Sequence, residues 1–332
     1  MLTPRTSAAL CRARETSVQA LPRNVSAAFV AAPQAAYGRP DWTHDGKDWP
    51  NRAHSRFVRV GTRRWHVQIM GQGPVLLLLH GTGAATHSWR DMLPCLAQNF
   101  TVVAPDLPGH GYTEQPANEG MTLPGMARGI AALLKQLNLH AVMAAGHSAG
   151  AAIALQMCLD GLMAPQAVVA LNGALLPLAF HGVGRSLMAP LAKLMASNPL
   201  VPMLFAWQAA DGNVVARLLA GTGSVIDADG AKFYARLARR SGHAGAALKM
   251  MANWDLDLFA ARLNKLSVPL LLVVGSNDRS IPPADATKIQ RSIPTARIIR
   301  MEGLGHLAHE ERPAETCEII ENFAVELGIL PP

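Results

Sequence analysis

Short apolar runs alternate with longer helical stretches along most of this chain, and this alternation limits its fold more than any other feature of the sequence. Five runs have the length and composition of strands buried on both faces: Val75–Leu79, Thr101–Ala104, Ala141–Ala145, Ala167–Leu171 and Pro269–Val274. Five helical stretches lie between or after them: Ser88–Gln98, Leu123–Leu137, Ala149–Leu159, Pro283–Arg291 and Pro313–Leu327. Strands that alternate with helices build a parallel sheet with helices on both faces. The sequence therefore predicts an α/β fold with a mostly parallel central sheet, preceded by a hairpin over Arg56–Val60 and Arg64–Met70.

The alternation stops between residues 173 and 255, where the chain is rich in Met, Leu and Ala and contains several prolines. An insertion at this point leaves the sheet after a strand, at the edge where open α/β sheets bind their ligands. We therefore expect a helical cap over residues 173–255. It would separate two parts of one α/β core, residues 41–172 and residues 256–332.

Residues 1–40 differ from the rest of the chain in composition. They hold five arginines, no lysine and one glutamate, without a sustained hydrophobic period. We interpret them as a disordered extension, although an organelle transit peptide has the same arginine-rich, acid-poor composition. This segment carries more than half of the formal net charge of +7, and the whole chain has only 3 Tyr and 8 Phe. We therefore expect no nucleic-acid partner, because the remaining chain has no basic and aromatic binding pattern.

The segment Gly146-His147-Ser148-Ala149-Gly150 follows one apolar run and opens a helical stretch. This is the pattern G-x-S-x-G in a strand–turn–helix context, which places a nucleophilic serine on a sharp turn. The flanking glycines allow the strand and the helix to approach closely. The helix N-terminus beside Ser148 favours a developing oxyanion. An N-capping serine in a glycine-rich helix start is the alternative reading of the same five residues.

A serine nucleophile needs a base and a carboxylate that orients the base, in the chain order Ser, Asp or Glu, His on this type of fold. Asp278 follows the apolar run Pro269–Val274, and His306 follows the strand-like segment Arg297–Met301. Both positions lie at the strand edge that carries Ser148. Asn172 occupies the alternative position for the acid and supplies no carboxylate. His309 is expected in a surface or capping role, not as a metal ligand.

The loop after Val75–Leu79 reads His80-Gly81-Thr82-Gly83. An amide of this loop commonly supplies one oxyanion donor, and the residue after the nucleophile supplies the other. We therefore predict that the N–H groups of Thr82 and Ala149 form an oxyanion hole. His80 is interpreted as a structural histidine that holds the loop.

Composition excludes several other classes of protein. Half of the residues are hydrophobic and 16% are charged, which suits a large core. The four cysteines, Cys11, Cys95, Cys158 and Cys317, lie far apart, so neither a disulfide framework nor a cysteine zinc site is expected. Glycine patterns for nicotinamide or nucleoside triphosphate binding do not occur in context. We expect no cofactor, no metal and no transmembrane segment, since the apolar stretch Asn198–Trp207 is short and contains prolines.

These motifs together resemble the α/β-hydrolase superfamily over residues 55–330, and the loop Asp106-Leu107-Pro108-Gly109-His110-Gly111 fits the same pattern. In more detail, the chain is similar to the magnesium chelatase accessory α/β-hydrolases of bacteriochlorophyll synthesis. Four segments carry this likeness: Asp45–Arg52, Trp65–Gln68, His80–Trp89 and Gly146–Gly150. The resemblance implies a cytoplasmic protein, or one peripheral to the photosynthetic membrane, that serves magnesium insertion and has the chelatase subunits as partners. It begins near Asp41 and argues against an organelle transit peptide.

Three functions remain open from the sequence. The first is a serine hydrolase that cleaves an ester or similar acyl bond with Ser148, His306 and Asp278. The second is a non-catalytic porphyrin-binding protein or chaperone for the chelatase, and the third is a cofactor-free C–C hydrolase or perhydrolase. The small-molecule substrate would be a tetrapyrrole or another hydrophobic ester. Apolar cap residues would either form its pocket above Ser148 or make up the cap's own core: Leu187, Met188, Leu191, Leu194, Met195, Met203, Leu204, Phe205 and Trp207. Basic cap residues could meet propionates, although such charges more commonly form a solvated face: Arg185, Arg217, Lys232, Arg236, Arg239 and Arg240.

Overall fold

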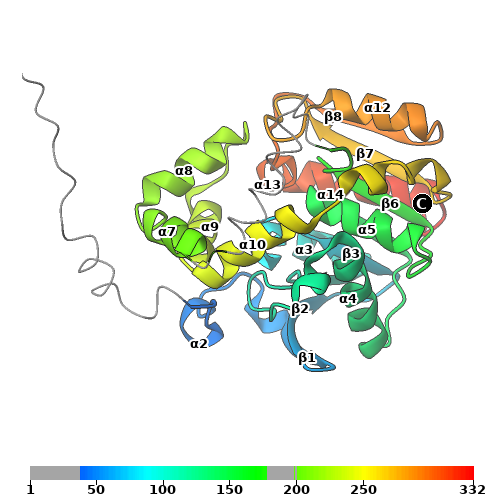
Figure 1. Cartoon of the computed structure of the whole chain (residues 1–332). Helices are drawn as coiled ribbons and strands as arrows, with labels where there is room; N and C mark the ends of the chain where they lie inside the picture. Colours follow the sequence, from blue (N-terminus) through cyan, green and yellow to red (C-terminus); the bar gives the residue numbers. More distant parts are fainter. Residues whose placement is uncertain (1–37, 178–197, 199) are drawn as a thin grey trace, which may run out of the picture. The chain divides into compact units, whose positions relative to one another are not determined.

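A single eight-stranded sheet forms the centre of the chain in the computed structural model, which describes residues 38–177, 198 and 200–332 (Figure 1). The strand order is β1-β2-β4-β3-β5-β6-β7-β8. The strands are β1 Ser55–Val60, β2 Arg63–Met70, β3 Val75–Leu79, β4 Thr101–Pro105, β5 Met143–His147, β6 Ala167–Leu171, β7 Leu270–Gly275 and β8 Arg297–Met301. The strand β2 is antiparallel to both β1 and β4, and all other neighbours are parallel. The predicted mostly parallel sheet is confirmed.

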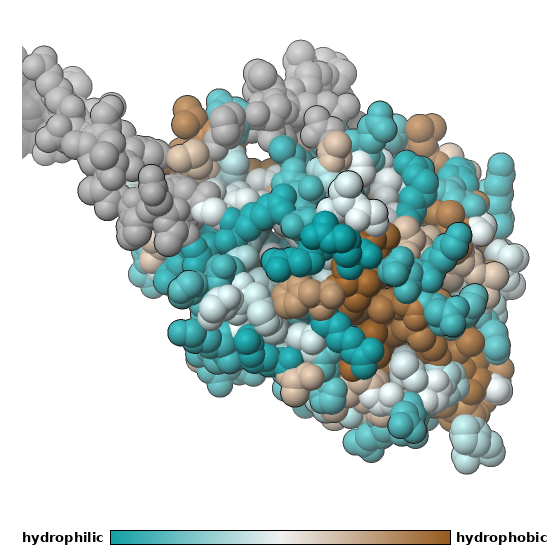
Figure 2. Space-filling view, turned by 90° about the horizontal axis from the view of Figure 1, so that it is seen from below, coloured by the Kyte–Doolittle hydropathy of each residue, from teal (hydrophilic) through white to brown (hydrophobic). Residues whose placement is uncertain are grey.

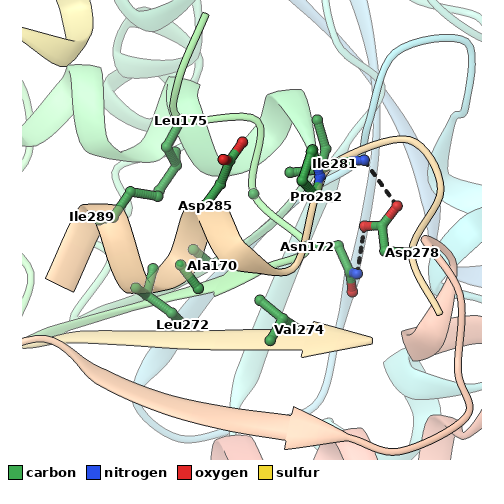
Figure 3. A pocket seen from close by; sticks show the side chains of 12 residues that line it. Ala170, Asn172, Leu175, Leu272, Val274, Asp278, Ile281, Pro282, Asp285 and Ile289 are labelled. Carbon is green, nitrogen blue, oxygen red and sulfur yellow. Dashed lines mark hydrogen bonds between the residues drawn. The ribbon is translucent and has the colours of Figure 1, made fainter. Parts of the chain in front are cut away.

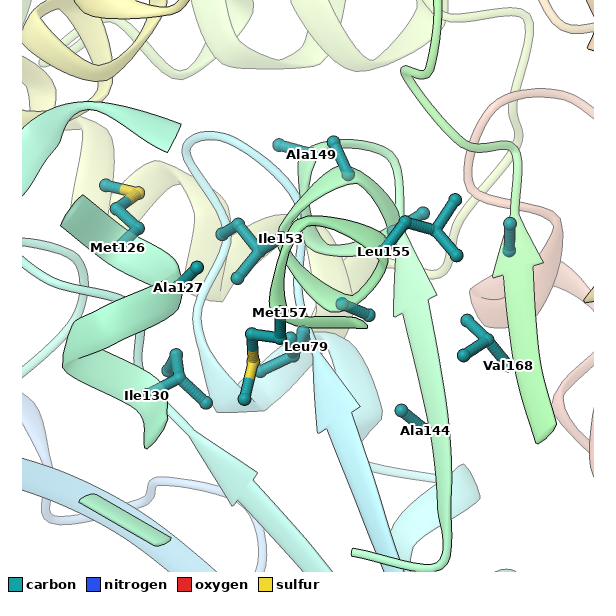
Figure 4. Close-up of a cluster of buried hydrophobic side chains, with 14 of the residues drawn as sticks. Leu79, Met126, Ala127, Ile130, Ala144, Ala149, Ile153, Leu155, Met157 and Val168 are labelled. Atoms are coloured by element: carbon teal, nitrogen blue, oxygen red, sulfur yellow. The ribbon is translucent and has the colours of Figure 1, made fainter. Parts of the chain in front are cut away.

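Helices cover both faces of the sheet, as predicted. Alternate strand residues point to opposite faces, so Leu77 and Leu79 of β3 lie in one apolar cluster and Leu76 and Leu78 in the other. The first cluster packs against α4 (Leu123–Gln136), α5 (Ala149–Leu159) and α12 (Ala284–Ser292), and Figure 4 shows its centre around Ile153. The second packs against α3 (Met92–Leu96) and α14 (Pro313–Glu326).

Two predicted elements differ from the structure by more than one residue at an end. The strand predicted over residues 141–145 lies at Met143–His147, so it runs directly into the turn at Ser148. The helix predicted over residues 88–98 is divided into the 3₁₀ helix η3 (Thr86–Trp89) and α3. Pro94 has no N–H to donate to the carbonyl of Arg90, which instead accepts a hydrogen bond from Asn51 Nδ2 at 2.9 Å. The loss of this helical bond explains the division.

The insertion between β6 and β7 contains four described helices: α7 (Leu200–Gln208), α8 (Gly212–Gly221), α9 (Ala228–Ala238) and α10 (Ser241–Asn253). They group on one side of the sheet in Figure 1. The short helix α11 (Leu256–Ala260) and the 3₁₀ helix η5 (Leu263–Lys265) return the chain to β7. The predicted cap residues Arg185, Leu187, Met188, Leu191, Leu194 and Met195 lie outside the described residues.

The segment before β1 packs against the cap and the sheet. It contains α2 (Trp42–Asp45) and the 3₁₀ helix η2 (Arg52–His54), and Trp49 is buried beside Phe233 of α9. Residues 1–37 of the predicted extension lie outside the described residues. Gly38 is described, and its carbonyl accepts a hydrogen bond from Gly242 N of α10 at 3.3 Å. The last residues of the predicted extension therefore contact the cap.

The surface is mixed in character. Figure 2 shows one face on which hydrophilic residues cover most of the area and hydrophobic residues gather in one connected region. In the part of the chain that the structure describes, no helix combines the length and apolar character needed to cross a bilayer.

Candidate active site

Ser148 lies at the turn between β5 and α5, and its backbone is in the left-handed region with φ 51° and ψ −115°. This conformation is strained for a residue with a side chain, and such strain is concentrated at functional sites. A Cβ at Gly146 would meet the backbone of Ala151, and one at Gly150 would meet the carbonyl of Leu79. The two glycines of the motif therefore allow the close packing of strand and helix that this turn requires.

Asp278 and His306 are in direct contact. His306 Nδ1 donates a hydrogen bond to Asp278 Oδ2 at 2.8 Å, and both side chains are buried. The other oxygen, Asp278 Oδ1, accepts from the backbone N–H groups of Ser280 at 2.7 Å and Ile281 at 2.9 Å. These bonds fix the carboxylate against the ring. With the Nδ1 proton bound to Asp278, the lone pair of His306 is on Nε2, as a general base requires.

His147, the residue before the serine, joins Ser148 to the loop of His306. Its Nε2 donates to the carbonyl oxygen of His306 at 2.8 Å, and the two imidazole rings are 4.7 Å apart. His147 is fully buried, and burial lowers its pKa well below the usual range. It therefore acts as a neutral donor that holds the His306 backbone next to the turn at Ser148. The sequence analysis did not assign this role to the variable position of G-x-S-x-G.

Asn172 is a second residue that the sequence analysis excluded from the site. It follows β6, and its Nδ2 donates to Asp278 Oδ2 at 2.7 Å (Figure 3). The alternative acid position thus holds an amide that supports the acid on the neighbouring strand. A pocket between β6, β7 and α12 reaches Asn172 and Asp278, and Asp285 of α12 also lines it. The position of Asn172 directly after a strand that neighbours the strand of Asp278 was the signal available in the sequence.

The predicted oxyanion loop forms a tight turn, in which Ala84 N donates to the carbonyl of Gly81 at 3.2 Å and Gly83 has φ 75°. A Cβ on Gly81 would lie 3.1 Å from Cβ of Ser148, so this loop lies directly beside the serine. Thr82 is in the turn, and Ala149 is the first residue of α5, where an N–H has no acceptor within the helix. The turn at Gly81 and the start of α5 therefore flank Ser148.

His80 holds this turn. Its Nδ1 donates to the carbonyl of Gly81 at 2.8 Å, and its Nε2 accepts from Leu107 N at 2.9 Å. Burial lowers the pKa of His80 to about 4, so the ring is neutral and can make both bonds. These contacts agree with the structural role predicted for His80.

The predicted surface or capping position of His309 is wrong, because His309 is only 1% exposed. Its Nε2 donates to Ser88 Oγ at 2.9 Å, and burial lowers its pKa to about 3. Ser88 in turn donates to Glu310, which also accepts from Arg90 and from Tyr234 of α9. The ring of Trp89, 4.8 Å from that of His309, fills the space that would expose it.

Three of the basic cap residues are paired with acids of the segment before β1. Arg236 binds Asp48 through both of its terminal nitrogens, at 2.6 and 2.9 Å, and Lys232 binds Asp48 at 2.9 Å. Arg240 binds Asp45 at 2.5 Å. These pairs fix α9 and the start of α10 to the segment before β1. The expectation that these three residues meet substrate propionates is therefore not supported.

A second set of serine, histidine and aspartate lies elsewhere in the sheet. His66 Nδ1 donates to Asp106 Oδ2 at 2.7 Å, and His66 Nε2 is 3.0 Å from Ser55 Oγ. Burial opposes the charge of Asp106, but His66 and backbone donors hold the pKa of this carboxyl well below its usual range. Ser55 also accepts from Gln68 Nε2 at 3.1 Å. This set ties β1, β2 and the loop after β4 together.

No group of three or more His, Cys, Asp or Glu with a metal-binding arrangement occurs within residues 38–177, 198 and 200–332.

Comparisons with known proteins agree with the fold. Residues 74–313 match the family described as the alpha/beta hydrolase fold. The magnesium-chelatase 30 kDa subunit of Rhodobacter capsulatus is 39% identical over 79% of this chain and 92% of its own length. The pimeloyl-[acyl-carrier protein] methyl ester esterase of Aeromonas hydrophila is 27% identical over 77% of this chain and 98% of its own. A solved serine hydrolase involved in carbazole degradation superimposes with a TM-score of 0.64 at 23% identity, covering 82% of this chain and 98% of its own.

Proposed function

Because this chain belongs to the α/β-hydrolase family, and within it to the group that includes the magnesium-chelatase 30 kDa subunit, we propose that it is a serine hydrolase that cleaves an ester or a similar acyl bond. One observation carries this proposal. A buried Asp278–His306 pair at 2.8 Å leaves Nε2 of the ring open, and His147 ties that ring's backbone to the strained turn at Ser148.

The reaction uses the chain's own residues in four roles. Ser148 Oγ attacks the acyl carbon while its proton passes to His306 Nε2, and Asp278 stabilises the imidazolium. The N–H groups of Thr82 and Ala149 bind the oxyanion, and each such donor stabilises the transition state by about 3–4 kcal/mol. His306 then protonates the leaving alcohol, and the acyl-enzyme is hydrolysed by a water that His306 deprotonates.

The likeness to the Rhodobacter protein supports a role beside magnesium chelatase, with a tetrapyrrole ester or another hydrophobic ester as substrate and chelatase subunits as partners. A cytoplasmic location, with contact to the photosynthetic membrane at most peripheral, is part of the same proposal. The pocket above Ser148 remains a prediction, because part of the cap lies outside the described residues.

A porphyrin-binding role without catalysis explains less of the site. Burial of a carboxylate is costly unless hydrogen bonds satisfy it, and Asp278 receives four. A carboxylate that orients an imidazole close to the strained turn of Ser148 serves proton transfer and gives no advantage for holding a flat ligand. Hydrolysis therefore accounts for the arrangement better.

A fluorophosphonate probe tests this proposal, since it reacts only with an activated serine. We expect labelling of the wild-type chain on Ser148, located by peptide mass spectrometry, and no labelling of Ser148→Ala. Ser55→Ala is the matched control, because Ser55 also contacts a histidine that is paired with an aspartate. An unlabelled wild-type chain, or label retained in Ser148→Ala, would contradict the assignment.

A further inference from the structure

The turn between α8 and α9 of the cap lies against both loops that carry the proposed acid and base. The carbonyl of Thr222 accepts hydrogen bonds from His306 N at 3.2 Å and from Arg279 N at 3.1 Å. Ser224 Oγ accepts from Leu307 N at 2.7 Å. The cap turn therefore bonds to the backbone of His306, of Leu307 and of Arg279, which follows Asp278.

Two glycines allow this close approach. Gly223 has φ 84°, and a Cβ there would collide with the carbonyl of Asn277, whose side chain donates to Gly223 O at 2.8 Å. A Cβ on Gly305 would collide with the backbone of Gly223 and Ser224. The cap turn and the His306 loop are thus packed backbone to backbone, with no side chain between them.

A second cap residue holds the opposite side of the site. His243 of α10 donates through Nε2 to the carbonyl of Gly83 at 3.0 Å and accepts through Nδ1 from Gly111 N at 3.0 Å. It is buried, and burial lowers its pKa, so the ring is neutral. Gly83 belongs to the turn that carries Thr82, and His80 holds the other end of that turn at Gly81.

Simple packing of a cap on a core would not require these bonds. Apolar contacts supply most of the stability of such interfaces, and they need no particular partner. Besides the ion pairs with the segment before β1 and the bond from Tyr234 to Glu310, the cap makes polar contacts with loops that carry or adjoin a proposed catalytic group. The contacts come from two separate parts of the cap, the α8–α9 turn and α10.

We propose that the cap is a positioning element of the catalytic site, in which Ser224 holds the His306 loop and His243 holds the oxyanion turn. This proposal rests on the proposed hydrolase function for its catalytic meaning. It implies that the cap is required even for small esters that make no contact with it. Ser224 and His243 are positioning residues, since each acts through the loop that it binds.

Hydrogen exchange read out by peptide mass spectrometry tests the positioning without reference to activity. Ser224→Ala is expected to speed amide exchange in residues 303–308 and to leave residues 80–84 unchanged. His243→Ala is expected to do the reverse, with faster exchange in residues 80–84 and 109–112. Val215→Ala is the control, because Val215 is a buried residue of α8, seven positions before Thr222, and its truncation loosens the cap core. Equal exchange in all four proteins, or a pattern that is the same for all three variants, would overturn the proposal.

Turnover of p-nitrophenyl acetate then tests the catalytic consequence. We expect Ser224→Ala and His243→Ala to lower kcat roughly ten- to hundred-fold with KM little changed, since small misplacements of catalytic groups have effects of this size. His243→Gln keeps a donor and an acceptor on one planar group and should recover part of kcat. Retention of wild-type kcat in both variants would contradict the proposal. A wild-type chain that hydrolyses no ester would instead contradict the proposed function, and hydrogen exchange would still decide whether the cap positions the loops.

Discussion

Two sets of serine, histidine and aspartate occupy different parts of this sheet, and in each a buried aspartate accepts a hydrogen bond from Nδ1 of a histidine. In one, Asp278 binds His306 at 2.8 Å near Ser148, and in the other Asp106 binds His66 at 2.7 Å beside Ser55. Both carboxylates also accept two backbone amides. The residue types and the Asp–His pairing therefore do not distinguish the two sets.

The backbone and the surroundings do distinguish them. Ser148 has φ 51° and precedes the 11-residue helix α5, whereas Ser55 has φ −76° and ψ 135° and opens an ordinary strand. His66 is enclosed by the rings of Trp42 and Phe57, at 4.9 and 5.2 Å. Strain at the serine, a helix N-terminus, and a histidine Nε2 without a hydrogen-bond partner among the described residues separate the proposed catalytic set from the structural one.

Removal of each serine gives the largest expected difference between the two sets. Ser148→Ala should lower ester turnover by roughly four to six orders of magnitude, because members of a catalytic triad act as a unit. Ser55→Ala should change kcat by no more than about two-fold, since Ser55 only joins β1 to His66 and Gln68 of β2. Steady-state kinetics on a p-nitrophenyl ester measures both. Near wild-type turnover in Ser148→Ala, or a collapse of turnover in Ser55→Ala, would remove the distinction.

Replacement of each aspartate by asparagine separates catalysis from stability. Asp278→Asn should lower kcat about 10³- to 10⁴-fold, because the amide no longer stabilises the imidazolium. Asp106→Asn should act mainly on stability and cost about 1–3 kcal/mol, because it weakens the buried hydrogen bonds that Asp106 accepts from His66 and from two backbone N–H groups. Urea unfolding and ester kinetics are measured on both variants. A wild-type rate in Asp278→Asn would place the acid elsewhere.

Much of the sheet could be predicted because its strands are buried on both faces and therefore appear as continuous apolar runs. Val75–Leu79, Ala167–Leu171 and Arg297–Met301 have the predicted boundaries. The turn at Ser148 was also predictable, since G-x-S-x-G reports a local backbone requirement. The division of the predicted helix before α3 is also a local backbone effect, caused by the missing N–H of Pro94, and was not predicted.

The contacts around the site could not be read from local spacing. His243 bonds to Gly111 and Gly83, which precede it by more than a hundred residues, and neither bond involves a motif. An amide such as Asn172 gives no local sign that it supports a carboxylate on the neighbouring strand, because its partner Asp278 lies 106 residues away. The buried position of His309 depends on Trp89 and Ser88, again distant in sequence.

Acid should lower the stability of the fold through buried neutral histidines such as His80. The pKa of His80 is lowered by burial from 6.5 to about 4, so its contribution to stability is complete above pH 6.5 and is lost as the pH falls toward 4. This loss amounts to about 3 kcal/mol at 1.36 kcal/mol per unit of pKa. Urea unfolding between pH 4 and pH 7 measures it. His80→Gln should reduce this dependence by about that amount, because other buried histidines with lowered pKa values contribute the rest, and His140→Gln, on the surface, should not reduce it. An unchanged slope in His80→Gln would contradict the assignment.

The smallest effect is expected from deletion of residues 1–37. Comparison with a longer deletion shows which N-terminal residues stabilise the region around Ser55 and His66. The shorter deletion keeps Gly38 and its bond to Gly242, so activity and Tm should change little, within about 2 °C. Deletion of residues 1–52 also removes Trp42, which covers His66, and Trp49, which donates to Thr86 Oγ1 at 2.9 Å. Loss of two packed tryptophans should lower Tm by roughly 10 °C or more. Calorimetry of both proteins measures this difference, and a large fall in Tm with the shorter deletion would show that residues 1–37 pack against the folded chain.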